Sequence, residues 1–324
     1  MNRRGALSAL LALCAAPPAF AQATRVSVGV LIAFPEADPE MRARLAAFVN
    51  GLQKLGWREG HNLRLDVRYA VGEAQLERQA GELAALGPAV MLVQTNLALA
   101  AVRKQNIAAP LVFVAVSDPV GGGFVASLAR PGGNVTGFAN FAPEMGAKWV
   151  EVLRELSPRV ERVMLLLNPA IAANQALARA AESAAATAGM AVTAIASGDS
   201  AAFEGAIAGF ADKSRAGIIV LPNPANTQNQ KLIIETAARH RLPAIYPFAY
   251  YARNGGLVAY AIDLEEQFRL AAAYVDRILR GAKPAELPVQ QPTKYELVIN
   301  LRAARALGLS VPGTLLVRAD EVIE

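Results

Sequence analysis

Polar side chains that could bind a small molecule follow several apolar stretches of this sequence. Ser117 and Asp118 come directly after the β-branched run Leu111–Val116, which is typical of a buried parallel strand. Pro119 cannot continue such a strand, so both side chains are expected at its carboxyl end. Ligands bind at that edge of open α/β sheets. We therefore interpret Asp118 as the partner of a ligand ammonium group.

Other strand ends carry residues that suit the rest of such a ligand. Thr95 and Asn96, together with Ser117 and nearby helix N-termini, suit a carboxylate. Aromatic rings could enclose an apolar group from two sides. The full set of candidate ligand-binding residues is Phe34, Thr95, Asn96, Ser117, Asp118, Asn140, Asn168, Asn223, Asn226, Tyr246 and Tyr250.

Each candidate also has a purely structural alternative. Asn, Asp, Ser and Thr at strand ends cap helices and form turns, and for any single position this role is about as well supported as ligand binding. Aromatic side chains also pack in cores, which is the role we favour for Phe248. The shared position of the candidates at strand ends favours a binding site.

No catalytic, nucleotide-binding or metal-binding motif accompanies them. The sequence lacks a G-x-S-x-G nucleophile elbow and a G-x-x-x-x-G-K-[ST] phosphate loop. Gly121–Ala126 matches G-x-G-x-x-A, but it does not directly follow the first strand of a βαβ unit, so we expect a turn there. His61 and His240 are far apart, and no cysteine follows Cys14. We therefore expect no cofactor, no metal site and no enzyme activity.

The first residues are typical of a secretory leader. Arg3 and Arg4 precede a short apolar run at 5–16, and Ala19–Ala21 fits a cleavage site before Gln22. The run is too short for a stable membrane anchor. We expect cleavage after Ala21 and export to the periplasm.

Removal of the leader would also remove Cys14, which lies early in the apolar run and which we do not expect to be lipid-modified. With Arg3 and Arg4 gone, the formal net charge falls from +5 to +3. This small excess is spread along the chain, so we expect no binding to nucleic acid.

Apolar runs alternate with helical patterns in two successive series. The first has strands at 26–32, 63–69, 90–95 and 111–116, with helices near 39–56, 74–86 and 97–105. The second has strands at 163–167, 191–195, 218–221 and 244–246, with helices near 144–157, 172–189, 200–212 and 227–240. This repetition predicts an α/β fold with two Rossmann-like lobes, each a parallel sheet flanked by helices.

The last part of the chain extends these lobes. A strand is expected at 257–262, and the capping box Asp263-x-x-Glu266 precedes a helix at 264–280. Thr293-x-x-Glu296 is a second capping box, and Leu315–Val317 is expected as a final strand.

Four blocks of this sequence resemble the substrate-binding proteins of one ABC-transporter family. They are Val116–Val120, Leu128–Gly137, Ala237–Pro247 and Gln291–Asn300. The resemblance covers nearly all of the chain after the leader, and the blocks are specific in combination. It implies a type I periplasmic binding protein, whose lobes are joined by three hinge crossovers near 137–138, 257–259 and 287–289. The N-terminal lobe would comprise 22–137 and 258–287, and the C-terminal lobe 138–257 and 288–324.

The resemblance also implies a function. Such a protein would be an exported, monomeric solute-binding component that delivers a small organic ligand, such as an aromatic amino acid or a related compound, to an ABC permease in the inner membrane. Ligand contacts to both lobes would favour a closed state. A periplasmic sensing module for a membrane receptor and a periplasmic enzyme on the same scaffold stay open as alternatives.

Overall fold

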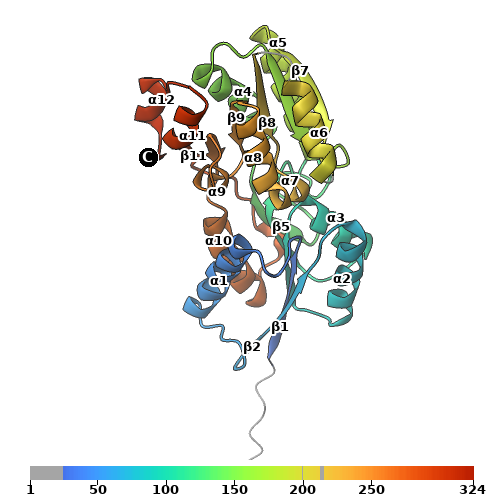
Figure 1. Cartoon of the computed structure of the whole chain (residues 1–324). Helices are drawn as coiled ribbons and strands as arrows, with labels where there is room; N and C mark the ends of the chain where they lie inside the picture. Colours follow the sequence, from blue (N-terminus) through green and yellow to red (C-terminus); the bar gives the residue numbers. More distant parts are fainter. Residues whose placement is uncertain (1–24, 199, 212–214) are drawn as a thin grey trace, which may run out of the picture.

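Two α/β lobes stacked end to end form the described part of the chain (Figure 1). A computed structural model describes residues 25–198, 200–211 and 215–324. The expected leader, residues 1–21, and its cleavage site lie outside the described residues. The two-lobed α/β architecture with parallel sheets flanked by helices is confirmed.

A five-stranded parallel sheet with the order β2-β1-β3-β4-β5 forms the centre of the N-terminal lobe. Its strands are β1 (Val26–Ile32), β2 (Leu63–Tyr69), β3 (Val90–Gln94), β4 (Leu111–Val116) and β5 (Val135–Ala139). The helices that cover it are α1 (Pro39–Lys54), α2 (Glu73–Ala85), α3 (Asn96–Lys104) and α10 (Leu264–Leu279). Val28 and Val30 point to one face of the sheet and pack with α1 and α10. Leu31 points to the opposite face, which packs with α2 and α3.

Helix α1 begins where the sequence predicts. The Asp38 carboxylate accepts a hydrogen bond from the Met41 amide at 3.0 Å, and Pro39 occupies the first helical position. The predicted cap of α10 is also present, since Asp263 accepts from the Glu266 amide at 2.9 Å. Helix α10 lies beside α1 although it comes late in the sequence (Figure 1).

A seven-stranded sheet with the order β12-β11-β10-β9-β8-β6-β7 forms the C-terminal lobe, and only its β10–β11 pair is antiparallel within the described residues. Its strands are β6 (Arg162–Leu167), β7 (Ala191–Ala196), β8 (Ala216–Val220), β9 (Ala244–Tyr246), β10 (Val258–Ala261), β11 (Glu296–Asn300) and β12 (Glu321–Ile323). Its helices are α4 (Met145–Leu156), α5 (Ala172–Thr187), α6 (Ser200–Ala211), α7 (Pro224–Gln228), α8 (Gln230–Arg239), α9 (Ala249–Arg253), α11 (Leu301–Ala306) and α12 (Gly313–Arg318). A short 3₁₀ helix, η1, spans Pro284–Glu286.

The chain passes between the lobes after β5, after β10 and before β11. Strand β5 stays in the N-terminal sheet up to Ala139, and Gln290 still pairs with Phe138. Strand β10, which we expected in the N-terminal lobe, instead pairs with β9 and β11 because its apolar residues extend the C-terminal sheet. The crossings therefore come a few residues later than the expected boundaries at 137, 257 and 287.

Two expectations for the C-terminal segment are wrong. Thr293 and Glu296 do not start a helix, because residues 296–300 form β11 and pair with β10. Residues 315–317 lie in α12, and the last strand is β12 instead. In both places pairing and packing across the lobe override a short local pattern.

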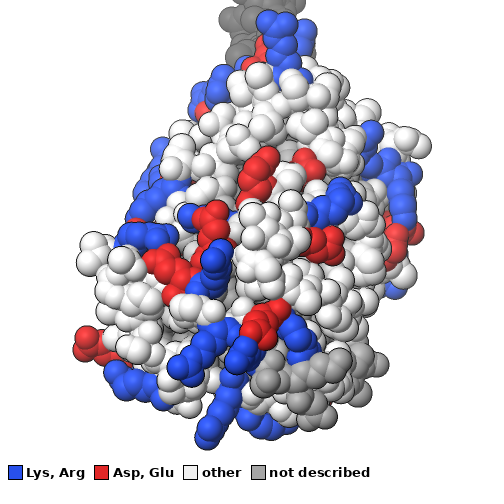
Figure 2. All heavy atoms as spheres, turned by 90° about the horizontal axis from the view of Figure 1, so that it is seen from above, with Lys and Arg blue, Asp and Glu red and all other residues white. Residues whose placement is uncertain are grey.

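Charged side chains of both signs lie side by side on the surface. On the face shown in Figure 2, Lys and Arg intermix with Asp and Glu. Ion pairs account for part of this pattern, for example Arg318 with Glu155 at 2.9 Å. Among the helices in the described ranges, none is both long and apolar enough to cross a membrane.

Candidate functional site

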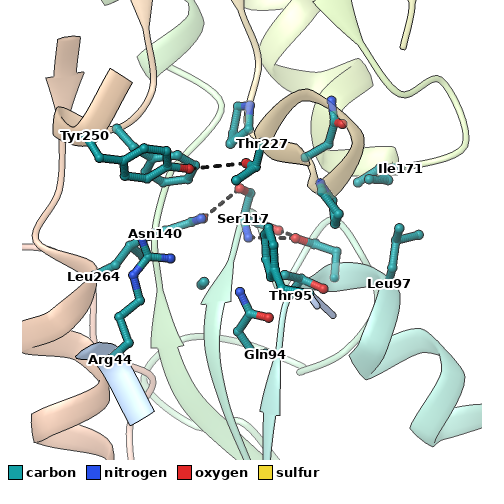
Figure 3. A pocket seen from close by; sticks show the side chains of 17 residues that line it. Arg44, Gln94, Thr95, Leu97, Ser117, Asn140, Ile171, Thr227, Tyr250 and Leu264 are labelled. Atoms are coloured by element: carbon teal, nitrogen blue, oxygen red, sulfur yellow. Dashed lines mark hydrogen bonds between the residues drawn. The ribbon is translucent and has the colours of Figure 1, made fainter. Parts of the chain in front are cut away.

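A cavity lies between the two lobes, where parallel strands of both sheets end (Figure 3). Strands β3 and β4 and the start of α3 form its polar side. Helices α7 and α9 and the segment before α5 form most of the opposite side. The predicted residues that line it are Phe34, Thr95, Asn96, Ser117, Asn140, Asn223 and Tyr250.

Three of these predicted residues hold one another in place. Asn96 clamps the backbone of Ser117: its Nδ2 donates to the Ser117 carbonyl at 2.8 Å and its Oδ1 accepts from the Ser117 amide at 3.0 Å. The Ser117 hydroxyl donates to Asn140 Oδ1 at 2.6 Å. These bonds tie α3, β4 and the segment after β5 together, so they fix the polar side of the cavity and use much of the side chains' hydrogen-bonding capacity.

Thr95 is held in a backbone conformation that side chains rarely adopt. Its φ of 82° and ψ of 158° lie in a region populated almost entirely by glycine. Its hydroxyl accepts a hydrogen bond from the Ala98 amide at 3.4 Å and caps α3, whose positive end faces the cavity. Such strain persists where the surrounding structure imposes it, commonly at ligand sites. This conformation agrees with a binding role for the segment.

Several lining residues are absent from the sequence-based set. Gln94 is the last residue of β3, and the apolar residues before it gave no sign of a polar role. Phe248 also lines the cavity, although we expected it in the core. Arg44 occupies the buried face of α1 between Met41 and Phe48, and an arginine on an apolar stripe is the signal that would have pointed to it. The other absent lining residues are Leu97, Ala115, Ile171, Pro222, Pro224, Thr227 and Leu264.

Stacked rings form the aromatic side of the cavity. Phe248 and Tyr250 stack with ring centres 5.5 Å apart and an angle of 14° between their planes. The Tyr250 hydroxyl donates to Thr227 Oγ1 at 3.3 Å, which fixes the ring (Figure 3). Phe34 lines the cavity from the other lobe and is 4 % exposed. A flat apolar group could therefore contact rings from both lobes.

Asp118 does not line the cavity. Its carboxylate accepts a hydrogen bond from the Gly121 amide at 2.9 Å, and its backbone has a positive φ of 42°. The contact supports the turn-forming role that was the alternative for this residue.

The remaining three candidates also lie outside the cavity. Asn168 Oδ1 accepts from the Ala170 amide at 2.9 Å in a turn. Asn226 is fully buried and its Nδ2 donates to two backbone carbonyls. Tyr246 is 1 % exposed and stacks on Tyr251 in the core, with ring centres 5.0 Å apart. Each serves the packing of the C-terminal lobe.

Raising the pH above 10 is expected to destabilise the protein through its buried tyrosines. Burial raises the pKa of Tyr250 to about 12, and it also raises the pKa values of Tyr246 and Tyr251. An unfolded tyrosine ionises near pH 10, so the unfolded state loses protons first. These tyrosines therefore do not lower the free energy of unfolding below pH 10. Above pH 10 each of them lowers it by about 1.4 kcal/mol per pH unit, until the pH reaches the pKa of that tyrosine in the folded state.

Urea unfolding at pH 9 and pH 11 measures this loss, with Tyr250→Phe as the matched variant. We expect the variant to lose about 1.4 kcal/mol less than the parent protein between the two pH values. Titrating groups that do not interact with Tyr250 cancel in this comparison. An equal loss in both proteins would show that the pKa of Tyr250 is not raised.

The two lobes and the cavity between them define the fold of the type I periplasmic binding proteins. The chain belongs to the ABC transporter substrate binding protein family, whose sequence profile matches residues 26–323. A relative in Clostridioides difficile (strain R20291), named tyrosine-binding protein, is 22% identical in an alignment of 304 residues that covers 91% of this chain and 85% of the relative.

Solved structures show the same fold. The ABC domain from Streptococcus pneumonia in complex with L-Trp has a TM-score of 0.85 and 22% identity, covering 93% of this chain and 100% of that one. A conserved domain protein from Vibrio cholerae has a TM-score of 0.84 and 28% identity, with coverages of 93% and 99%. The ligand-free, open structure of a substrate binding protein with adhesive properties from Clostridium difficile has a TM-score of 0.67 and 21% identity, with coverages of 92% and 99%.

Proposed function

We propose that this protein captures an aromatic amino acid or a related compound in the interlobe cavity and delivers it to an ABC permease in the inner membrane. One observation carries the proposal: hydrogen-bonding groups of the N-terminal lobe face stacked rings of the C-terminal lobe across one cavity. A molecule with a charged end and a ring has partners for both parts there. The relatives that bind tyrosine and L-Trp support this ligand class.

Closure of the lobes over the ligand is the mechanism that we infer. The guanidinium carbon of Arg44, in the N-terminal lobe, lies 5.4 Å from the centre of the Tyr250 ring, in the C-terminal lobe. The chain also superposes better on the L-Trp complex than on the ligand-free, open structure, at nearly equal identity. Both observations support a closed arrangement here. Ligand contacts to both lobes would favour this arrangement over an open one.

The proposal includes export and binding without turnover. The expected leader at 1–21 and the family support a periplasmic protein. The proposal also takes it to act as a monomer. Cavity side chains such as Ser117 and Thr95 donate or accept fixed hydrogen bonds, and no described side chain there pairs a nucleophile with a base. This supports binding rather than catalysis.

Native mass spectrometry of the protein purified from periplasm tests the proposal. We expect a chain that begins at Gln22 and carries a noncovalent adduct with the mass of an aromatic amino acid. Unfolding and refolding should remove the adduct, and adding the amino acid should restore it. A sugar adduct, or no adduct after incubation with all twenty amino acids, would contradict the ligand class. A chain that begins at Met1 would contradict export.

A further inference from the structure

Arg44 brings a buried positive charge to the cavity wall. It lies on the core-facing side of α1, and its side chain is only 6 % exposed. Figure 3 shows the side chain extending from α1 toward Tyr250 at one side of the cavity. A buried charge is costly unless it is paired, so the partners of this guanidinium decide what it can bind.

The guanidinium carbon lies 5.4 Å from the centre of the Tyr250 ring, and the polar partners leave part of the guanidinium unused. Nη2 lies 3.3 Å from Glu40 Oε2, and Nη1 lies 3.6 Å from the Met41 sulfur, which is a weak acceptor. Nε donates to no described residue, although a guanidinium has five N–H donors. The Glu40 carboxylate is 45 % exposed and lies outside the cavity lining, so solvent weakens its pairing with Arg44.

A second donor, on a different element, faces the same space. Gln94 is 2 % exposed, and its Oε1 accepts from the Ala33 amide at 3.1 Å. Its Nε2 donates to no described residue and points up from the end of β3 into the cavity (Figure 3). Among the described residues that line the cavity there is no Asp or Glu. The lining therefore offers a cation and an unpaired amide donor, and no carboxylate for a ligand ammonium group.

We propose that Arg44 and Gln94 bind the carboxylate of the ligand, and that the site requires this anionic group while the ammonium group is dispensable. The inference rests on the proposed function and defines its substrate class: aromatic carboxylates, including deamino acids as well as amino acids. It differs from the expectation that Asp118 pairs with an ammonium group, because that carboxylate is held by the Gly121 amide.

Isothermal titration of the unmodified protein with three matched ligands tests the charge requirement. The ligands are L-tyrosine, L-tyrosinamide and 3-(4-hydroxyphenyl)propanoate, which share a ring and differ in the charged groups. We expect the amide to bind about ten- to a hundredfold more weakly than tyrosine, and the deamino acid to bind within about tenfold of it. An amide that binds as tightly as tyrosine, or a deamino acid that binds a hundredfold more weakly, would overturn the inference.

A pair of variants on one helix tests the residue. Arg44→Gln and Arg42→Gln both remove one positive charge from α1, but Arg42 is exposed and does not line the cavity. We expect a ten- to a hundredfold loss of carboxylate affinity in Arg44→Gln only, with amide affinity unchanged. Arg44→Lys keeps the charge and loses the planar fork, so an intermediate loss is expected. A purely structural role would weaken the acid and the amide equally, and that result would overturn the inference.

The outcomes separate this inference from the proposed function. If aromatic amino acids do not bind, but another carboxylate binds to the parent protein and not to Arg44→Gln, the proposed ligand is wrong and the inference stands. If tyrosine binds equally well to the parent protein and to Arg44→Gln, the inference is wrong and the proposed function stands. If no carboxylate binds, both are wrong.

Discussion

Addition of an aromatic amino acid is expected to raise the free energy of unfolding by about 2.7 kcal/mol when its concentration is a hundred times its dissociation constant. Only the folded state has the cavity and can bind the ligand, so the ligand stabilises the folded state by mass action. Burial of the ligand's aromatic ring against Phe34, Phe248 or Tyr250 contributes roughly 1.5–3 kcal/mol to the binding free energy, before the entropic costs of ordering are subtracted.

A thermal-shift screen with tryptophan, phenylalanine and tyrosine measures this effect. The same samples in solution scattering should become more compact, because closure brings α1 of one lobe and α9 of the other together around the ligand. A sugar and an inorganic anion serve as controls. No shift with any of the three amino acids, together with a clear shift with a control, would rule out the ligand class and leave the fold intact.

Gly146→Ala is expected to destabilise the folded protein by about 3 kcal/mol or more. Gly146 lies in the first turn of α4, where α4 packs against α5. A methyl group there would lie 2.0 Å from the Leu177 carbonyl oxygen and 3.0 Å from the Ala181 amide nitrogen. Both atoms belong to the backbone of α5, so only a shift of that helix could make room.

Gly209→Ala is the matched control because it adds the same methyl group to a helix without crowding. No described residue lies within 4 Å of the added atom, and alanine favours helix over glycine by about 1 kcal/mol. We expect this variant to be unchanged or slightly more stable in urea unfolding. If Gly146→Ala unfolds at the same urea concentration as the parent protein, the two helices are not in this close contact.

The sequence supports the fold more fully than the site. Runs such as 111–116 are apolar on every residue, which restricts them to sheets covered on both faces, and their alternation with helical stripes leaves few other architectures. The boundaries between the lobes were harder to predict from the sequence. The strand at 258–261 could extend either sheet, and only its pairing with β9 and β11 decides between them.

The sequence predicted where the site lies, at the ends of the strands, but it did not predict which side chains there could bind a charged group of a ligand. Strand ends led to Thr95, Asn96 and Ser117, all of which line the cavity. The same rule also led to Asp118, because a turn-forming and a ligand-binding aspartate look alike in one sequence. Arg44 lies in the middle of a helix, and only the folded structure shows that its buried face ends at the cavity rather than in the core.

The position of α10 has a consequence for how the chain acquires its structure. The core between α1 and the N-terminal sheet includes Phe268 and Val275 of α10, so it stays open until that helix has been made. At about 5–20 residues per second, synthesis from the end of β5 to the end of α10 takes roughly 7–28 s. During that time the growing chain keeps an unfinished lobe. The contact between α1 and α10 would thus delay folding of this lobe until most of the chain exists, and a late fold of this kind agrees with the proposed export, in which the polypeptide crosses a membrane before it becomes compact.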